Sequence, residues 1–253
     1  MIRRSTILFL LTAVLLPGCA WIRDQFAPPN FVREQFFRGS SCGNEADEMV
    51  KVGSLCLDKY EASLWTTPHG ETQLNAVPPE CAPNGVGCVN IVYALSKPNV
   101  QPARSLTWFQ ASIACANTGK RLPTNAEWQQ AAVGTPDSGG RCNIQSGAVT
   151  LTGQNSQCRS ALGIYDLVGN VSEWVADWMQ SNTRNDGGNV STVEFGQDVI
   201  AGIDEGAPES ARLPPALIRG GSFRDGTGAG AYALDAQNGP SRTRDWIGFR
   251  CAR

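Results

Sequence analysis

Alternating apolar and polar residues begin at Met49. Residues 49–52 read M-V-K-V, and residues 55–62 read L-C-L-D-K-Y-E-A. Alternation over four to eight residues is typical of a strand with one buried face, and two such runs joined by a short turn indicate a hairpin. We therefore predict a β-hairpin near the start of the domain. Residues 66–102 hold many turn-forming residues and the pair Cys81/Cys88, which predicts a loop closed by that pair.

Two helices follow, and each has its own capping signal. Thr107 and Gln110 stand three residues apart, as do Thr124 and Glu127. This spacing lets the threonine and the longer side chain each bond the other's backbone amide. A glycine after each run can end the helix. The apolar positions at helical spacing are Trp108, Ala111 and Cys115 in the first helix and Trp128, Ala131 and Ala132 in the second.

Beyond residue 134 the pattern changes to short strands separated by long loops. The expected strands are Leu162–Leu167, Glu173–Trp178, Leu217–Phe223 and Ile247–Cys251. Early helices with a later β-rich half predict an α+β fold. About 210 residues remain after the N-terminal segments, and this length suits one domain. The 27 glycines and 15 prolines indicate a loop-rich architecture.

The N-terminus has the pattern of an export signal. Arg3 and Arg4 precede an apolar run, Ile7–Leu16, that is too short to span a bilayer. The run ends Leu-Pro-Gly-Cys19, which resembles the bacterial lipobox. That resemblance implies cleavage before Cys19 and acylation of its thiol, with residues 1–18 as signal peptide. The alternative is an ordinary secretory signal that contains a cysteine.

We expect the mature protein to be anchored through Cys19, with residues 19–41 as a tether and residues 42–253 as the displayed domain. Several acyl chains on one residue hold a protein firmly, because each buried methylene contributes about 0.8 kcal/mol. Ala20 stands where an aspartate would resemble an inner-membrane retention signal. We therefore expect the outer membrane or the cell surface of a bacterium.

Cysteine and histidine usage limits the chemistry. Nine cysteines less Cys19 leave eight, an even set that suits an oxidising compartment. The sequence has no Cys-x-x-Cys pair, and His69 is its only histidine. This composition argues against a zinc site and against Ser-His or Cys-His catalysis. The net charge of -2 and the lack of a basic run after the signal argue against nucleic-acid binding. We expect a monomer.

Four blocks identify a family resemblance. Residues 121–132 (R-L-P-T-N-A-E-W-Q-Q-A-A) and 165–174 (Y-D-L-V-G-N-V-S-E-W) are the first two, and 219–223 (R-G-G-S-F) and 248–252 (G-F-R-C-A) are the last. In this order they resemble the motifs of the formylglycine-generating, or sulfatase-modifying factor, family. The resemblance spans about 44–253. It implies that family's variant of the C-type lectin fold, an irregular α+β domain with two main helices, small twisted antiparallel sheets and adjacent chain ends.

The resemblance also implies bonds and ligands. Cys115 and Cys251 match a family disulfide, and the simplest remaining pairs are Cys142/Cys158, Cys81/Cys88 and Cys42/Cys56, although sequence alone does not establish connectivity. In related members the G-N-V-x-E-W turn binds Ca²⁺ through carbonyls and the glutamate, ligands that suit this cation. The corresponding calcium ligands here are Val168, Gly169, Val171 and Glu173. The alternative is that Glu173 hydrogen-bonds the amides of its turn.

The catalytic residues of the family are missing. Its oxygenase activity uses two cysteines shortly after R-G-G-S-W to bind Cu(I), a soft ion that requires thiolates. Residues 224–232 contain no cysteine, and Cys251 is the only cysteine beyond residue 158. The iron-dependent branch of the superfamily needs several histidines. We therefore expect no enzyme activity of either kind and neither copper nor iron. The alternative is a metal-dependent oxidase whose chemistry has moved elsewhere.

Residues 224–246 stand where the active site would be. Small residues alternate there with polar and aromatic ones, and the segment resembles the variable region of retroelement-diversified surface lipoproteins. That resemblance implies that segment 219–253 carries a surface for a protein or glycan ligand. Tyr, Trp and Arg also dominate binding hot spots. The expected ligand-binding residues are Arg224, Asp225, Thr227, Tyr232, Asp235, Gln237, Asn238, Arg242, Thr243, Arg244, Asp245 and Trp246. The alternatives are a solvated loop without a partner and a structural envelope lipoprotein.

Overall fold

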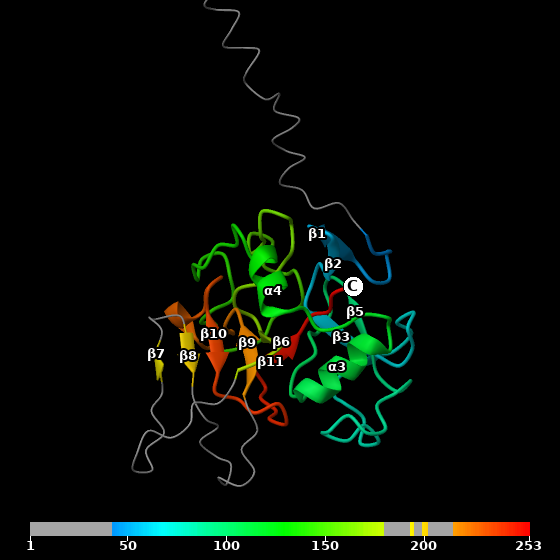
Figure 1. Ribbon diagram of the computed structural model, residues 1–253. Coiled ribbons are helices and arrows are strands. Elements are labelled where there is room, and N and C mark those ends of the chain that lie inside the picture. The colour runs from blue at the N-terminus through cyan, green and yellow to red at the C-terminus, as the bar shows by residue number, and fades with distance from the viewer. Residues whose placement is uncertain (1–41, 180–192, 195–198, 202–214) are drawn as a thin grey trace, which may run out of the picture. The chain divides into compact units, whose positions relative to one another are not determined.

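A computed structural model describes residues 42–179, 193–194, 199–201 and 215–253 (Figure 1). It begins with a two-stranded antiparallel sheet of β1 (Met49–Val52) and β2 (Leu55–Asp58). Gly53 adopts a φ of 60° in the turn between the strands. Such left-handed backbone suits glycine because it has no Cβ. The predicted hairpin is therefore confirmed.

A second sheet has three antiparallel strands, in the order β4, β3, β5. They are β3 (Ala62–Trp65), β4 (Gln73–Leu74) and β5 (Tyr93–Ser96). The prediction of a loop over 66–102 was incomplete, because β4 and β5 lie within it. The two residues of β4 are too few to show a period, and the last three residues of β5 are buried without alternation. Such short apolar runs carry no strand signal of their own.

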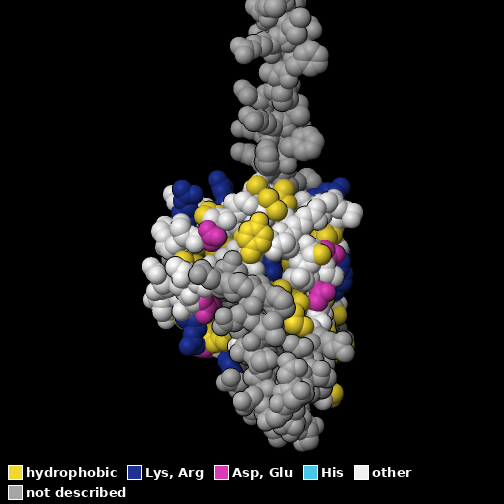
Figure 2. Space-filling model, turned by 60° about the vertical axis from the view of Figure 1, so that its left-hand side comes forward, with side chains coloured by type: hydrophobic (Ala, Val, Ile, Leu, Met, Phe, Trp, Pro, Cys, Tyr) yellow, Lys and Arg dark blue, Asp and Glu magenta, His cyan; other side chains and the backbone are white. Residues whose placement is uncertain are grey.

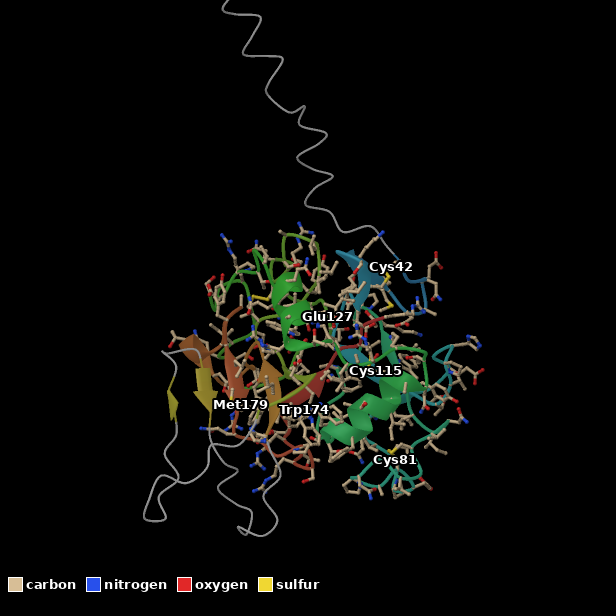
Figure 3. The ribbon with its side chains drawn as sticks, viewed as in Figure 1. Cys42, Cys81, Cys115, Glu127, Trp174 and Met179 are labelled. Carbon is tan, nitrogen blue, oxygen red and sulfur yellow. A yellow bond between two sulfur atoms is a disulfide. The ribbon has the colours of Figure 1, made fainter. Side chains whose placement is uncertain are left out.

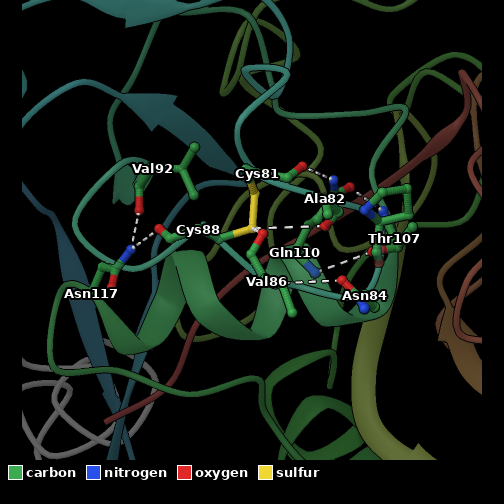
Figure 4. The surroundings of a disulfide bond; sticks show 10 residues. Cys81, Ala82, Asn84, Val86, Cys88, Val92, Thr107, Gln110 and Asn117 are labelled. Atoms are coloured by element: carbon green, nitrogen blue, oxygen red, sulfur yellow. Dashed lines mark hydrogen bonds between the residues drawn. A yellow bond between two sulfur atoms is a disulfide. The ribbon is translucent and has the colours of Figure 1, made fainter.

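The loop closed by Cys81 and Cys88 lies against the first helix (Figure 4). The side chain of Gln110 donates to the Cys81 carbonyl at 2.9 Å. Asn117 donates to the carbonyls of Cys88 at 2.9 Å and Val92 at 2.7 Å. Polar side chains at both ends of one helix thus hold a segment that has little regular structure of its own.

Both predicted helices are present, as α3 (Trp108–Ala116) and α4 (Asn125–Ala131). Thr107 and Gln110 form one capping box, and Thr124 and Glu127 form the other. Each box satisfies backbone amides that a helix start leaves without partners. The predicted inward positions are buried except Trp108, which is half-buried. The caps were readable because they depend on residues only three positions apart.

The third sheet has six strands in the described residues, in the order β11-β6-β9-β10-β8-β7. They are β6 (Ser172–Trp178), β7 (Val193–Glu194), β8 (Val199–Ala201), β9 (Ala216–Arg219), β10 (Leu234–Ala236) and β11 (Ile247–Phe249). The expectation of antiparallel sheets needs correction here, since β11 pairs with β6, and β10 with β8, in parallel. The predicted strand Leu162–Leu167 is wrong: only one isolated bridge, Arg159 to Tyr165, forms there.

The C-terminal residues close the domain onto its beginning. Cys56 and Arg253 exchange backbone hydrogen bonds at 2.7 and 2.8 Å, and Ala252 forms bridges with Leu57 and Arg121. The four disulfides join Cys42–Cys56, Cys81–Cys88, Cys115–Cys251 and Cys142–Cys158, the same pairs that the sequence suggested. Figure 3 marks Cys42, Cys81 and Cys115 in separate parts of the domain. The architecture is α+β, as predicted.

Two clusters of buried side chains form the core. One surrounds Trp128 of α4, and the other surrounds Trp174 of β6, which Figure 3 labels. Both tryptophans are fully buried, and each indole N–H has an acceptor, as a buried polar group requires. No helix among the described residues is both long enough and apolar enough to span a bilayer.

Candidate ligand-binding face

The segment after β9 begins with a tight turn. The Asp225 carboxylate accepts hydrogen bonds from the Ser222 amide at 2.7 Å and from its hydroxyl at 2.8 Å. Gly221 has a φ of 72°, and a Cβ there would lie 2.5 Å from the Cα of Ala229. Only glycine fits this close approach of two backbones. The second half of R-G-G-S-F therefore sets how the chain folds back onto the sheet.

After the short 3-10 turn η2 (Gly226–Gly228), the small residues turn inward and one aromatic residue turns outward. Ala229, Ala231 and Ala233 are buried, whereas Tyr232 is 69% exposed. Alanines fit where the segment packs against the core cluster around Trp128. The alternation noted in the sequence therefore separates residues that support the segment from a side chain that it presents to solvent.

The predicted ligand-binding residues do not form a uniform surface. The exposed ones are Arg224, Asp225, Thr227, Tyr232, Thr243 and Asp245. The half-buried ones are Asp235, Gln237, Arg242, Arg244 and Trp246, and Asn238 is buried. Sequence could not separate these groups because β10, which takes in Asp235, had no recognisable strand pattern.

Asp225, Asp235 and Asn238 bond to neighbouring parts of the chain. Besides Asp225, which holds the turn at Ser222, Asp235 accepts from the Gln237 amide at 2.7 Å and from the Asn238 side chain at 3.2 Å. Burial raises the pKa of Asp235 to about 6. The Asn238 carbonyl accepts from the Ala216 amide at the start of β9. Asp235 and Asn238 therefore maintain the shape of the segment and contribute less to its outer surface, whereas Asp225 holds the turn and stays exposed.

The outer part of the segment contains an arginine, an aspartate and a tryptophan in contact. The Arg224 guanidinium lies 5.9 Å from the centre of the Trp246 ring, and its Nη1 lies 3.9 Å from Asp245 Oδ1. Trp246 also packs against the core cluster around Trp174. The sequence placed all three residues in the ligand-binding set, and the structure brings them together.

Arg104 also belongs to this group, and sequence reasoning missed it. Its Nη1 donates to the Asp245 carbonyl at 3.3 Å, although the two residues are 141 positions apart. The amide of the next residue, Ser105, donates to the Arg244 carbonyl at 3.0 Å. No local pattern marks Arg104, since only the return of the chain end past the segment before α3 brings it here.

Glu173, a predicted calcium ligand, has its carboxylate bonded to other side chains. Its carboxylate accepts from Arg250 Nε at 2.9 and 2.7 Å, from Arg250 Nη2 at 2.6 Å and from the Trp128 indole at 2.7 Å. Both side chains of the ion pair are buried. A calcium ion would have to replace a guanidinium that has no other carboxylate at ion-pair distance among the described residues. The one charged member of the set Val168, Gly169, Val171 and Glu173 is therefore not free to bind a cation.

The alternative for Glu173, bonding to the amides of its turn, also differs from the structure. Glu61 takes that role, since it accepts from the Val171 amide at 2.9 Å and from the Asn170 side chain at 2.6 Å. Burial raises the pKa of Glu61 well above its ordinary range, and the charges of Asp166 and Glu173 raise it further. Glu61 lies between β2 and β3, far in sequence from the motif that it supports.

The thiols are all bonded within the described residues. Cys251 is joined to Cys115, and residues 224–250 contain no cysteine. No group of three or more His, Cys, Asp or Glu side chains is placed to hold a metal ion in the part of the chain that the structure describes. The family's copper-binding pair thus has no counterpart at the positions that follow R-G-G-S-F.

The fold and the blocks around this face define a C-type-lectin-like α+β domain. A family model for the sulfatase-modifying factor enzyme 1-like domain matches residues 43–253. The chain belongs to that family.

Curated relatives include enzymes and other proteins. The formylglycine-generating enzyme of Thermomonospora curvata is 30% identical over 183 residues, which cover 62% of this chain and 56% of the relative. The serine/threonine-protein kinase Pkn1 of Chlamydia trachomatis is 30% identical over 160 residues, covering 60% of this chain and 24% of the kinase. The chain thus spans about half the length of the first relative and a quarter of the second.

Solved structures share the fold. The P3c variant of the Major Tropism Determinant matches with a TM-score of 0.50 and 21% identity, covering 85% of this chain and 54% of that one. Treponema denticola variable protein 1 matches with a TM-score of 0.47 and 15% identity, covering 85% of this chain and 92% of that one. At such identities the likeness concerns the fold alone.

Proposed function

We propose that this protein is a lipid-anchored bacterial surface protein that binds a protein or glycan ligand through the face formed by residues 224–246. One observation carries the proposal: the family's copper-binding cysteines are missing after R-G-G-S-F, and polar and aromatic side chains stand in their place. The nearest cysteine, Cys251, is bonded to Cys115.

The chemistry of the missing groups supports binding over oxidation. Copper(I) needs soft ligands such as thiolates, and non-haem iron sites are built on several histidines. The chain has one histidine, His69, in a loop between β3 and β4. The outward residues, by contrast, are of the types that contribute most to binding energy, namely an exposed tyrosine and an arginine beside a tryptophan.

The likeness to diversified proteins supports a variable face. The alanines at 229, 231 and 233 are buried, while Arg224, Thr227 and Tyr232 between and before them are exposed. Exposed positions can change without disturbing the core, and this property is what a diversified surface requires. A near-copy of the codons for 219–253 beside a reverse transcriptase gene, differing at adenines, is the genomic observation that tests this part.

Tyr232 is the most direct test of the face. We expect Tyr232→Ala to lose at least tenfold in affinity for a partner purified from the envelope of the native host, with an unchanged melting temperature. The matched control is Val86→Ala, which truncates another exposed side chain on the Cys81–Cys88 loop. Equal loss in both variants, or no loss in the first, would exclude the face as the binding site.

Anchoring is tested separately. Cys19→Ser should move the protein from the membrane fraction to the soluble fraction, and mass spectrometry of the wild-type N-terminal peptide should find acyl chains on Cys19. Metal analysis of the purified protein addresses the enzyme alternative. Stoichiometric copper or iron, retained through dialysis, would favour an oxidase with relocated chemistry, and a protein with no captured partner would favour a structural envelope component.

A further inference from the structure

Two arginines from distant parts of the chain meet at Asp245. Arg104 reaches the backbone carbonyl of Asp245 at 3.3 Å from the segment before α3. Arg224 approaches the carboxylate from the turn after β9, at 3.9 Å. The side chains of Arg224 and Asp245 are 54% and 64% exposed. We name the group of Arg104, Arg224, Asp245 and Trp246 the arginine patch.

The guanidinium groups of this patch keep most of their hydrogen-bonding capacity. A guanidinium has five N–H donors in a planar fork. The bond to the Asp245 carbonyl uses one donor of Arg104, and no carboxylate lies at ion-pair distance from that residue in the described part of the chain. With the described residues, the Arg224 guanidinium makes a long ion pair and a contact with the Trp246 ring. Both can therefore bind a carboxylate by two parallel hydrogen bonds, the geometry that suits arginine best.

The carboxylates near the arginine patch differ in how free they are to pair with its guanidinium groups. Asp225 is bonded to Ser222, and Asp235 is bonded to Gln237 and Asn238. Among the described residues, the Asp245 carboxylate alone approaches a patch arginine, at the edge of ion-pair distance. A ligand carboxylate could take the place that Asp245 holds weakly. In the view of Figure 2, acidic and basic side chains are scattered among hydrophobic ones.

From this geometry we infer that the ligand is a protein that presents Asp or Glu side chains to the arginine patch. The inference rests on the proposed function and names its ligand class. The Arg224 guanidinium lies over the Trp246 ring, 5.9 Å from its centre, and a sugar that stacked on that side of the indole would have to displace it. Arginine and tryptophan, which meet in this patch, are instead two of the residue types that dominate protein-binding hot spots. Arg104 is a ligand-contacting residue outside the variable segment.

The test uses the full chain, immobilised, with fluorescent poly-L-glutamate as the probe. We expect binding that weakens as salt is raised, because exposed charges are screened. Arg104→Ala with Arg224→Ala should weaken binding at least tenfold. Asp245→Ala should strengthen it several-fold, since the competing carboxylate is gone. Arg159→Ala, which removes an exposed arginine beside Tyr165, is the matched control and should have no effect.

Three results would overturn the inference. The first is no binding of poly-L-glutamate to the wild type, and the second is equal binding to the double variant and the Arg159 control. The third is arginine-dependent binding of polygalacturonate without binding of poly-L-glutamate, which would assign an acidic glycan. In each case the Tyr232 experiment with the native partner remains valid, so failure of the acidic-protein inference is distinguishable from failure of the binding face. Unchanged melting temperatures exclude unfolding as the cause.

Discussion

The Arg250 guanidinium holds the Glu173 carboxylate at the centre of the domain, with its Nη2 2.6 Å from Glu173 Oε1 and both side chains buried. Its other N–H groups donate to the carbonyls of Asp58 at 2.9 Å and Tyr165 at 2.8 Å. Two motifs of the family, Y-D-x-x-G-N-V-x-E-W and G-F-R-C-A, thus meet in one ion pair. This pair connects the residue that follows β11 to the neighbouring strand β6.

Removing Arg250 should strongly destabilise the fold. Arg250→Met leaves the Glu173 carboxylate buried without its cation, and such a change typically costs about 3–5 kcal/mol. The control is Arg121→Met, which breaks the more exposed pair with Glu127 and should cost about 0–1 kcal/mol. Urea denaturation followed by circular dichroism measures both. Similar losses in the two variants would show that burial of the Glu173 pair does not matter.

Stability should fall as the pH rises from 5 to 8. Burial raises the pKa of Asp166 from 3.8 to about 7, against the lowering effects of the Gly153 amide and Arg250. Burial likewise raises the pKa of Asp58 to about 6, although Lys120 lowers it. Between the unfolded and folded pKa values the folded state binds more protons than the unfolded chain, so the free energy of unfolding decreases with rising pH.

Asp166→Asn tests this reasoning. Asparagine can still accept the Gly153 amide and tolerates the φ of 56° at this position. We expect the free energy of unfolding of the variant to depend less on pH than that of the wild type. At pH 8 it should be higher than that of the wild type by more than about 1 kcal/mol, since a difference of one unit in pKa corresponds to about 1.4 kcal/mol. Equilibrium unfolding at several pH values gives the slope. An unchanged slope would mean that Asp166 is not the group responsible.

The Cys115–Cys251 disulfide should contribute more stability than Cys81–Cys88. The first closes a loop of 136 residues and the second a loop of 7. Chain entropy predicts about 5 kcal/mol for the long loop and about 2.5 kcal/mol for the short one. Paired alanine variants at each bridge, compared by chemical denaturation, measure the difference. An equal loss would indicate that contacts of the Cys81–Cys88 loop with α3 matter as much as loop closure.

Tyr232 and Trp246 should respond differently to truncation. Trp246 packs against the core, so Trp246→Ala should cost about 2–4 kcal/mol, less than a fully buried tryptophan can. Tyr232→Ala should change stability by less than about 0.5 kcal/mol because the ring faces solvent. Differential scanning calorimetry distinguishes them. A binding defect in Trp246→Ala would therefore need a stability correction, and one in Tyr232→Ala would not.

Calcium should leave the melting temperature of the domain unchanged. Arg250 and Trp128 occupy the Glu173 carboxylate, so a cation gains no ligand there without breaking a buried ion pair. Thermal melts in excess EDTA and in millimolar calcium test this expectation. A stabilisation by calcium that disappears in Glu173→Gln would restore the calcium assignment.

Local patterns in the sequence determined the first hairpin, the two capped helices and the α+β class. Each depends on residues a few positions apart, such as Thr107 with Gln110, whose geometry the backbone sets directly. The blocks also identified the family. The cysteine count allowed a disulfide framework, and the missing cysteines after Phe223 argued against copper.

Only the tertiary structure decided which polar residues serve the fold and which face solvent. Glu173 forms an ion pair with Arg250, and Glu61 accepts the Val171 amide of the turn in place of Glu173. Arg104 bonds to Asp245, although 141 positions separate the two residues. Strand β10 likewise has no local sequence signal, because the strand forms through its pairing with β9 and β8. Contacts between distant segments depend on the path of the whole chain, and a one-dimensional pattern does not contain that path.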